Sequence, residues 1–113
     1  MSSQVDVAKR VEMFVKTMKD NGINANLDTM VFNPKDGVSQ YIIGLKLTDD
    51  ATAKLNEILK KAQFIPRGSK TLPSGAIADA YERKEDKNVC ELLIVRDKNN
   101  KNNANIILKV KNT

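Results

Sequence analysis

The chain has 113 residues, and its 19 Lys and Arg side chains against 14 Asp and Glu side chains give a net charge of +5. It contains no histidine and one cysteine. This composition excludes imidazole acid–base catalysis, Ser-His-Asp and Cys-His nucleophile systems, internal disulfides and CxxC zinc sites. With 41% hydrophobic and 29% charged residues, we expect a globular protein with one domain over residues 1–113.

The first predicted element is an amphipathic helix over residues 3–21. Ser3 is a candidate N-cap, and Asn21-Gly22 supplies the left-handed residue that commonly ends a helix. Apolar residues recur at spacings of three and four, with charged residues on the rest of the wheel. The apolar stripe comprises Val7, Ala8, Val11, Phe14, Val15 and Met18.

A β-hairpin is expected next. Strands over residues 23–32 and 38–47 flank the segment 33–37, Asn-Pro-Lys-Asp-Gly, whose residue types are typical of a turn. Gly44, inside the second strand, indicates a bulge or a close neighbour. Alternation places one set of apolar side chains on a single face: Tyr41, Ile43, Leu45 and Leu47.

A second helix is expected over residues 50–63, capped by Thr48-Asp49-Asp50. Its apolar stripe comprises Ala51, Leu55, Ile58, Leu59 and Ala62.

Residues 66–75 lack hydrophobic periodicity and are predicted to form a loop. Three further strands follow, over residues 76–83, 89–96 and around 106–110. Because both faces of the 89–95 run are apolar, we expect a central strand that is covered on each side.

The element order α-β-β-α-β-β-β predicts an α+β fold, a two-layer structure with two helices and a mostly antiparallel five-stranded sheet. No apolar run approaches the roughly 20 residues needed to span a bilayer. The first ten residues do not resemble a secretory signal, and Cys90 is expected to be a buried structural thiol, so we expect a cytoplasmic protein. Enrichment in Lys and Asn is associated with AT-rich genomes, such as those of some phages and bacteria.

The strongest candidate site joins the end of the second helix to the 66–75 loop. Residues 60–70 contain four cations and no acid. The candidate residues for binding an anion or an acidic partner are Lys60, Lys61, Arg67, Ser69 and Lys70. A solvated connector between helix and strand explains the same residues. The phosphate-binding pattern GxxxxGK[ST] is absent.

The net charge lies in the second half of the chain. Residues 1–56 carry seven basic and seven acidic side chains, whereas residues 57–113 carry twelve and seven. Two predicted turns hold further cations: Arg83, Lys84 and Lys87 in one, and Arg96, Lys98 and Lys101 in the next. Because successive turns of a meander lie at opposite ends of a sheet, we do not expect one continuous patch. Solvated turns explain these cations equally well.

No carboxylate pair or metal-ligand pattern suggests catalysis, so we expect no catalytic residues, no metal and no cofactor. The sequence favours a non-catalytic protein-binding regulator, inhibitor or adaptor without membrane association. The alternative is a basic nucleic-acid-binding accessory protein that uses residues 57–113. A homodimer is a further hypothesis, because Ile106–Val110 is expected to be an edge strand with apolar residues on both faces, and such a strand invites pairing.

Overall fold

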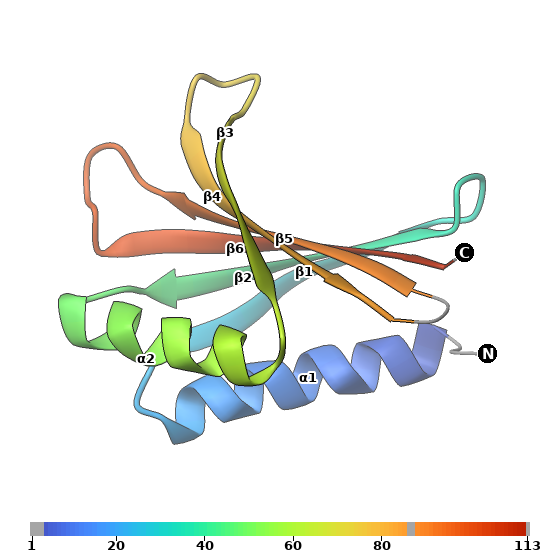
Figure 1. The fold of residues 1–113 in the computed structure, drawn as a ribbon, viewed down its shortest axis with the longest axis horizontal. Helices are drawn as coiled ribbons and strands as arrows, with labels where there is room; N and C mark the ends of the chain where they lie inside the picture. The colour runs from blue at the N-terminus through green and yellow to red at the C-terminus, as the bar shows by residue number, and fades with distance from the viewer. Residues whose placement is uncertain (1–3, 86–87, 113) are drawn as a thin grey trace.

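The computed structural model describes residues 4–85 and 88–112, which form an antiparallel sheet with both helices on one face (Figure 1). The elements are α1 Gln4–Asp20, β1 Ala25–Asn33, β2 Val38–Lys46, α2 Asp49–Lys61, β3 Ile65–Thr71, β4 Ile77–Lys84, β5 Asn88–Arg96 and β6 Asn103–Asn112. The strand order is β1-β2-β6-β5-β4-β3, and every neighbouring pair is antiparallel. The predicted α+β class is confirmed, but the sheet has six strands rather than five. The candidate cap Ser3 lies outside the described residues.

The additional strand is β3, which takes up most of the predicted 66–75 loop. It lies at the sheet edge, and all of its residues are exposed. Its pairing with β4 is interrupted between Pro66 and Ser69, and Gly68 there has a φ of +80°. A proline and a positive-φ glycine are tolerated at an edge, where one side of the strand has no ladder to complete. The strand therefore carries none of the alternation by which strands are detected in a sequence.

Two expectations about the later strands need correction. Strand β6 lies between β2 and β5, so the hypothesis of a homodimer through an exposed β6 edge is wrong, and the edges are β1 and β3. Strand β5 is interior as predicted, but the helices cover only one of its faces (Figure 1). Neither helix of the described residues, 4–85 and 88–112, covers the other face of β5. A small cluster of Ala78, Ala80 and Leu93 packs there instead.

The main core lies between the helices and the sheet, and the predicted stripes supply it. Helix α1 contributes Val7, Val11, Val15 and Met18, helix α2 contributes Ala51, Leu55 and Leu59, and the sheet contributes residues such as Tyr41, Ile43, Leu92, Ile106 and Leu108. Thr48 is the N-cap of α2, and its Oγ1 accepts a hydrogen bond from the N–H of Ala51 at 3.2 Å. Local sequence signals therefore place both helices correctly on the sheet.

Gly44 has the close neighbour that its position in a strand suggested. Strand β1 bulges between Leu27 and Thr29, and the extra residue there is Asp28. A Cβ atom at position 44 would lie 2.7 Å from the Asp28 Oδ2 atom. The glycine therefore leaves room for a carboxylate that the bulge turns toward β2.

The two helices end in Schellman motifs, one with glycine and one without it. Gly22 ends α1 with a φ of +80°, as predicted. At the end of α2 the residue in this position is Gln63, with a φ of 65°. Its N–H donates to the Lys60 carbonyl at 3.0 Å, and the N–H of Phe64 donates to the Leu59 carbonyl at 3.0 Å. A left-handed conformation is costly for a residue with a Cβ atom.

We expect Gln63→Gly to raise the free energy of unfolding by about 0.5–1 kcal/mol, because glycine removes the left-handed strain and this gain exceeds its cost in unfolded-state entropy. Urea unfolding measures the change. Gln63→Ala is the matched control, since alanine keeps the strain and should not stabilise the protein. An equal gain from both variants would show that the Gln63 side chain, and not its backbone conformation, is responsible.

Candidate functional site

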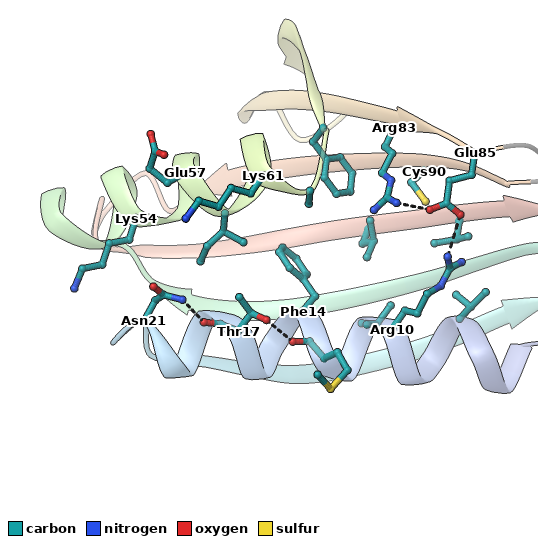
Figure 2. A pocket seen from close by; sticks show the side chains of 18 of the residues that line it. Arg10, Phe14, Thr17, Asn21, Lys54, Glu57, Lys61, Arg83, Glu85 and Cys90 are labelled. Carbon is teal, nitrogen blue, oxygen red and sulfur yellow. Dashed lines mark hydrogen bonds and ion pairs between the residues drawn. The ribbon is translucent and has the colours of Figure 1, made fainter.

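A groove with a volume of about 760 Å³ separates α1 from α2 above the sheet (Figure 2). One face of each helix forms its walls, and β5 and β6 form its floor. The lining along α1 runs from Val7 to Asn21, the residue that follows the helix. This stretch corresponds to roughly 21 Å along the helix axis at 1.5 Å per residue. Such a volume lies within the range of established ligand-binding sites.

The interior of the groove is apolar. Leu108 and Val110 of β6 are buried beneath it. Five further apolar side chains are only half-buried, because the two helices do not close over them: Phe14, Ile58, Ala62, Phe64 and Cys90. Met13, at the α1 rim, is 60% exposed. Apolar surface left open between two helix walls is typical of a binding site.

The rim of the groove is charged (Figure 2). Among the described residues that line it, four are basic and two are acidic, which gives a net charge of +2: Arg10, Lys54, Lys61 and Arg83 against Glu57 and Glu85. Lys54 also pairs along α2 with Asp50, at 3.1 Å between Nζ and Oδ2. The rim therefore favours a ligand whose polar edges are acidic.

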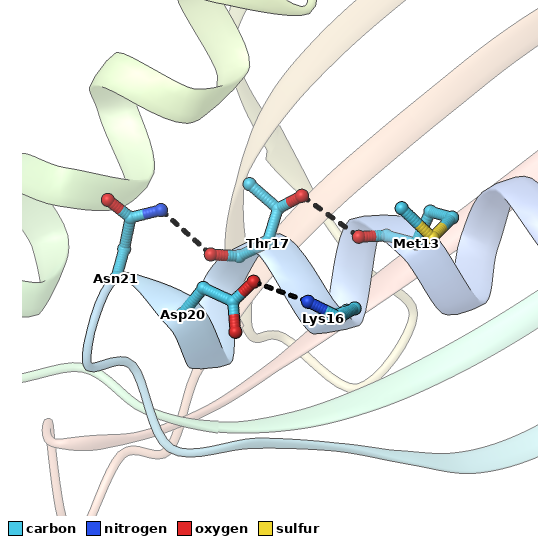
Figure 3. A network of polar contacts seen from close by, with 5 residues as sticks. All are labelled: Met13, Lys16, Thr17, Asp20 and Asn21. Carbon is cyan, nitrogen blue, oxygen red and sulfur yellow. Dashed lines mark hydrogen bonds and ion pairs between the residues drawn. The ribbon is translucent and has the colours of Figure 1, made fainter.

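The rest of the α1 rim carries no charge, and its polar side chains, Thr17 and Asn21, bond to the backbone of α1 (Figure 3). The Thr17 Oγ1 donates to the Met13 carbonyl at 2.9 Å, and the Asn21 Nδ2 donates to the Thr17 carbonyl at 2.8 Å. Lys16 and Asp20 pair at 2.7 Å and do not line the groove. The α1 wall near its C-terminal end therefore offers shape rather than charge.

Three charged side chains close the other end of the groove. The Glu85 carboxylate receives the Arg10 Nη1 at 3.0 Å on Oε2 and the Arg83 Nη2 at 2.5 Å on Oε1 (Figure 2). The hydrogen bond from Arg10 holds the pKa of Glu85 below its usual range, and the charge of Arg83 acts in the same direction. The carboxylate therefore stays ionised and links α1 to the end of β4.

Cys90 lines the groove rather than being fully buried as expected. Burial raises the pKa of the Cys90 thiol, and the nearby charge of Glu85 raises it further. The thiol therefore stays protonated near neutral pH, where a protonated thiol is a poor nucleophile. Its position makes it part of the apolar floor.

The sheet divides the predicted 60–70 site between its two faces. Lys61 lines the groove on the helix side. Arg67 and Lys70 pair with acids on the opposite face, at 3.9 Å to Glu82 and 3.6 Å to Glu91. These glutamates alternate along their strands with Tyr81 and Leu92, which pack on the helix side. Lys60 and Ser69 are exposed and do not line the groove, so the five residues do not converge.

The first predicted basic turn is divided in the same way. Arg83 points into the groove, whereas the neighbouring Lys84 lies 3.6 Å from Glu82 on the opposite face. Lys87 lies outside the described residues.

The second basic turn lies at the other end of the sheet. Arg96 donates to the Thr52 Oγ1 at 3.0 Å and to the Lys101 carbonyl at 3.1 Å, so it ties β5 to α2. Lys98 and Lys101 are exposed. Arg96 therefore has a structural role, and the two turns do not combine into one patch.

Sequence reasoning missed the groove itself. Phe14 and Ile58 were assigned to apolar stripes, and Arg10 and Glu85 belong to segments 75 positions apart in the chain. One feature of the sequence does indicate a groove. Met13 lies beside Phe14 and makes the apolar face of α1 wider than its contact with the sheet requires.

Within residues 4–85 and 88–112, no group of three or more Cys, Asp or Glu side chains could hold a metal ion. In the same part of the chain, neither helix is long and apolar enough to cross a lipid bilayer.

Comparison of the chain with protein-family models, curated proteins and solved structures finds no match.

The link between Glu85 and the two arginines predicts a pH-dependent stability. The pKa of Glu85 is lower in the folded protein than its ordinary value of 4.5. The ionised Glu85 therefore adds to the free energy of unfolding above pH 4.5, and this contribution is lost as the pH falls through the pKa of Glu85 in the folded protein. We expect Glu85→Gln to cost up to about 1 kcal/mol at neutral pH and progressively less below about pH 5.

Urea unfolding of both proteins at several pH values between neutral and about pH 3 measures this difference. A difference that stays constant across this range would contradict the assignment of the ion pair as its source.

Proposed function

We propose that this protein is a non-catalytic binding protein that takes an amphipathic helix of a partner protein into the groove between α1 and α2. In this way it would act as a regulator, inhibitor or adaptor. The observation that carries the proposal is the row of half-buried apolar side chains between two helix walls. Proteins that recognise helices use a groove of this kind to bury the apolar face of the incoming helix.

The dimensions of the groove suit a helix. About 14 residues of helix match the roughly 21 Å that the groove follows along α1. The apolar face of such a helix presents side chains at every third or fourth position. These would contact Phe14, Ile58 and Phe64 from above, while the helix body packs between the two walls.

The charges of the rim favour acidic residues on the flanks of that helix. The lining residues of the described chain carry a net charge of +2, and Lys54 and Lys61 follow one wall. Charge complementarity of this kind speeds encounter and selects among partners, while the apolar contacts supply most of the affinity.

The aromatic residues weigh against the nucleic-acid alternative. All five lie on the helix side of the sheet. Four of them are in or against the main core: Phe14, Tyr41, Phe64 and Tyr81. Phe32 is paired with Ser39, which faces the same side of β2 as Tyr41. The open face of the sheet therefore offers no ring on which a base could stack. Of the cations on this face, Arg67, Lys70 and Lys84 each lie near a glutamate, and Lys109 is in register with Glu91 of β5.

A displayed library of helical peptides of about 14 residues, with an apolar face and randomised flanks, tests the proposal. Selection on the wild-type protein should enrich Asp and Glu on the flanks. Ala53→Trp, which fills the α2 wall of the groove, should weaken the selected peptides at least about tenfold.

Asn56→Trp is the matched control, because Asn56 is exposed on α2 outside the groove. It should leave binding unchanged. The proposal fails if no peptide is enriched, or if the selected peptides bind Ala53→Trp as well as they bind the wild-type protein.

For nucleic acid, we expect no binding tighter than about 100 μM to random-sequence DNA or RNA at about 50 mM salt, because the cations do not form a continuous track. Fluorescence anisotropy measures this affinity. Micromolar binding that weakens steeply with salt would favour the nucleic-acid alternative instead.

A further inference from the structure

We propose that the outer edge of β1 pairs with the same edge of a second copy of this chain, so that the two sheets join across a two-fold axis at Val31. Strand β1 lies at one end of the strand order, and no strand of the described residues pairs with its outer side. No residue of β1 lines the groove. The inference therefore concerns a different surface and does not depend on the proposed function.

The two edges of the sheet differ in how they are protected from pairing. Strand β3 carries Pro66, a positive-φ Gly68 and two cations, all of which hinder the addition of another strand. In β1 the segment 29–33 contains no proline, no glycine and no charge. Its three apolar side chains are each between 38% and 58% exposed: Met30, Val31 and Phe32. An exposed apolar edge of this kind is a template for pairing with another chain.

The backbone groups that face outward are those of Met30 and Phe32. The Asn33 carbonyl accepts a hydrogen bond from the Gly37 N–H at 3.0 Å, so Asn33 directs its backbone groups toward the β2 side. Because the backbone groups of successive residues in a strand point to opposite sides, Met30 and Phe32 direct theirs away from β2. Each copy therefore offers the N–H and C=O groups of two residues to a neighbouring strand.

The ends of this segment select one register for self-pairing. The bulge at Asp28 and the missing N–H of Pro34 interrupt the edge at equal distances on either side of Val31. Antiparallel pairing about Val31 places Met30 of each copy opposite Phe32 of the other, so that their outward groups all find partners. A shift of the register by two residues would pair one of these residues with the bulge or with the proline instead.

The charges beside the segment favour the antiparallel arrangement. A parallel pair would place the two Asp28 carboxylates side by side, which is unfavourable. Antiparallel pairing separates them and brings each Asp28 to the end of the other strand, where Lys35 follows. Asp36 is already engaged within that turn, because its Oδ1 accepts a hydrogen bond from the Val38 N–H at 3.1 Å.

The contact is small and closed. Three apolar side chains from each copy and about four backbone hydrogen bonds form it, so we expect a reversible dimer with a Kd of about 10–100 μM. The two-fold arrangement uses the β1 edge of both copies and leaves the protected β3 edges outside. Assembly therefore ends at two copies.

Sedimentation velocity at concentrations from about 5 μM to about 1 mM tests the proposal, since this range brackets the expected Kd. The mass should rise from the 12.6 kDa of one chain toward twice this value, with no larger species. Val31→Lys and Val31→Glu each place like charges on the axis and should weaken the dimer at least about tenfold. An equimolar mixture of the two variants should dimerise again, because lysine then faces glutamate.

Ile65→Lys is the matched control, because Ile65 is 51% exposed on the other edge strand, compared with 53% for Val31. It should leave the dimer unchanged. Circular dichroism should show a wild-type fold for all variants, since each replaces an exposed side chain. The proposal is overturned if the wild-type protein stays monomeric throughout, or if Val31→Lys dimerises as tightly as the wild type. A mixture that fails to dimerise overturns the register about Val31.

Discussion

The structure depends on how two helices share one face of a six-stranded sheet. Both helices are held by apolar contacts to the sheet, through residues such as Met18 and Leu55. Few apolar contacts are left to draw the helices together, so the groove is a geometric result of this arrangement rather than a defect in packing. Beyond the end of α2, Glu85 and its two arginines take the place of a helix wall and close the groove.

The distribution of positive charge shows how misleading linear clustering is in a β-rich chain. Arg83 and Lys84 are adjacent in sequence, yet one lines the groove and the other lies on the opposite face. The basic segment 60–70 crosses from a helix to an edge strand and is divided by the sheet. Conversely, Arg10 and Glu85 lie far apart in the sequence and are in contact. Pairing register and topology therefore decide which charged side chains share a surface of this protein.

What the sequence predicted well was local. The α2 cap at Thr48, the end of α1 at Gly22 and the alternation through Tyr41 and Ile43 each depend on neighbouring residues, and each is present. Strand β3 was missed because an edge strand needs no apolar face, and its Pro66 and Gly68 resemble a loop. The interior place of β6 was missed because it pairs with β2 across most of the chain. The groove could not be predicted from a helical wheel, which shows which side of a helix is apolar but not how far away the next helix lies.

The pairing of β2 with β6 has a consequence for how the protein reaches its folded state. Tyr41 pairs with Leu108, so β2 and β6 join residues that lie far apart in the chain. Contacts of such long range slow folding, because closing the intervening loop costs entropy before the pairing stabilises it. Leu108 and Val110 on β6 are also the floor of the groove. The floor of the groove is therefore built by the same long-range pairing that joins β1 and β2 to the other strands of the sheet.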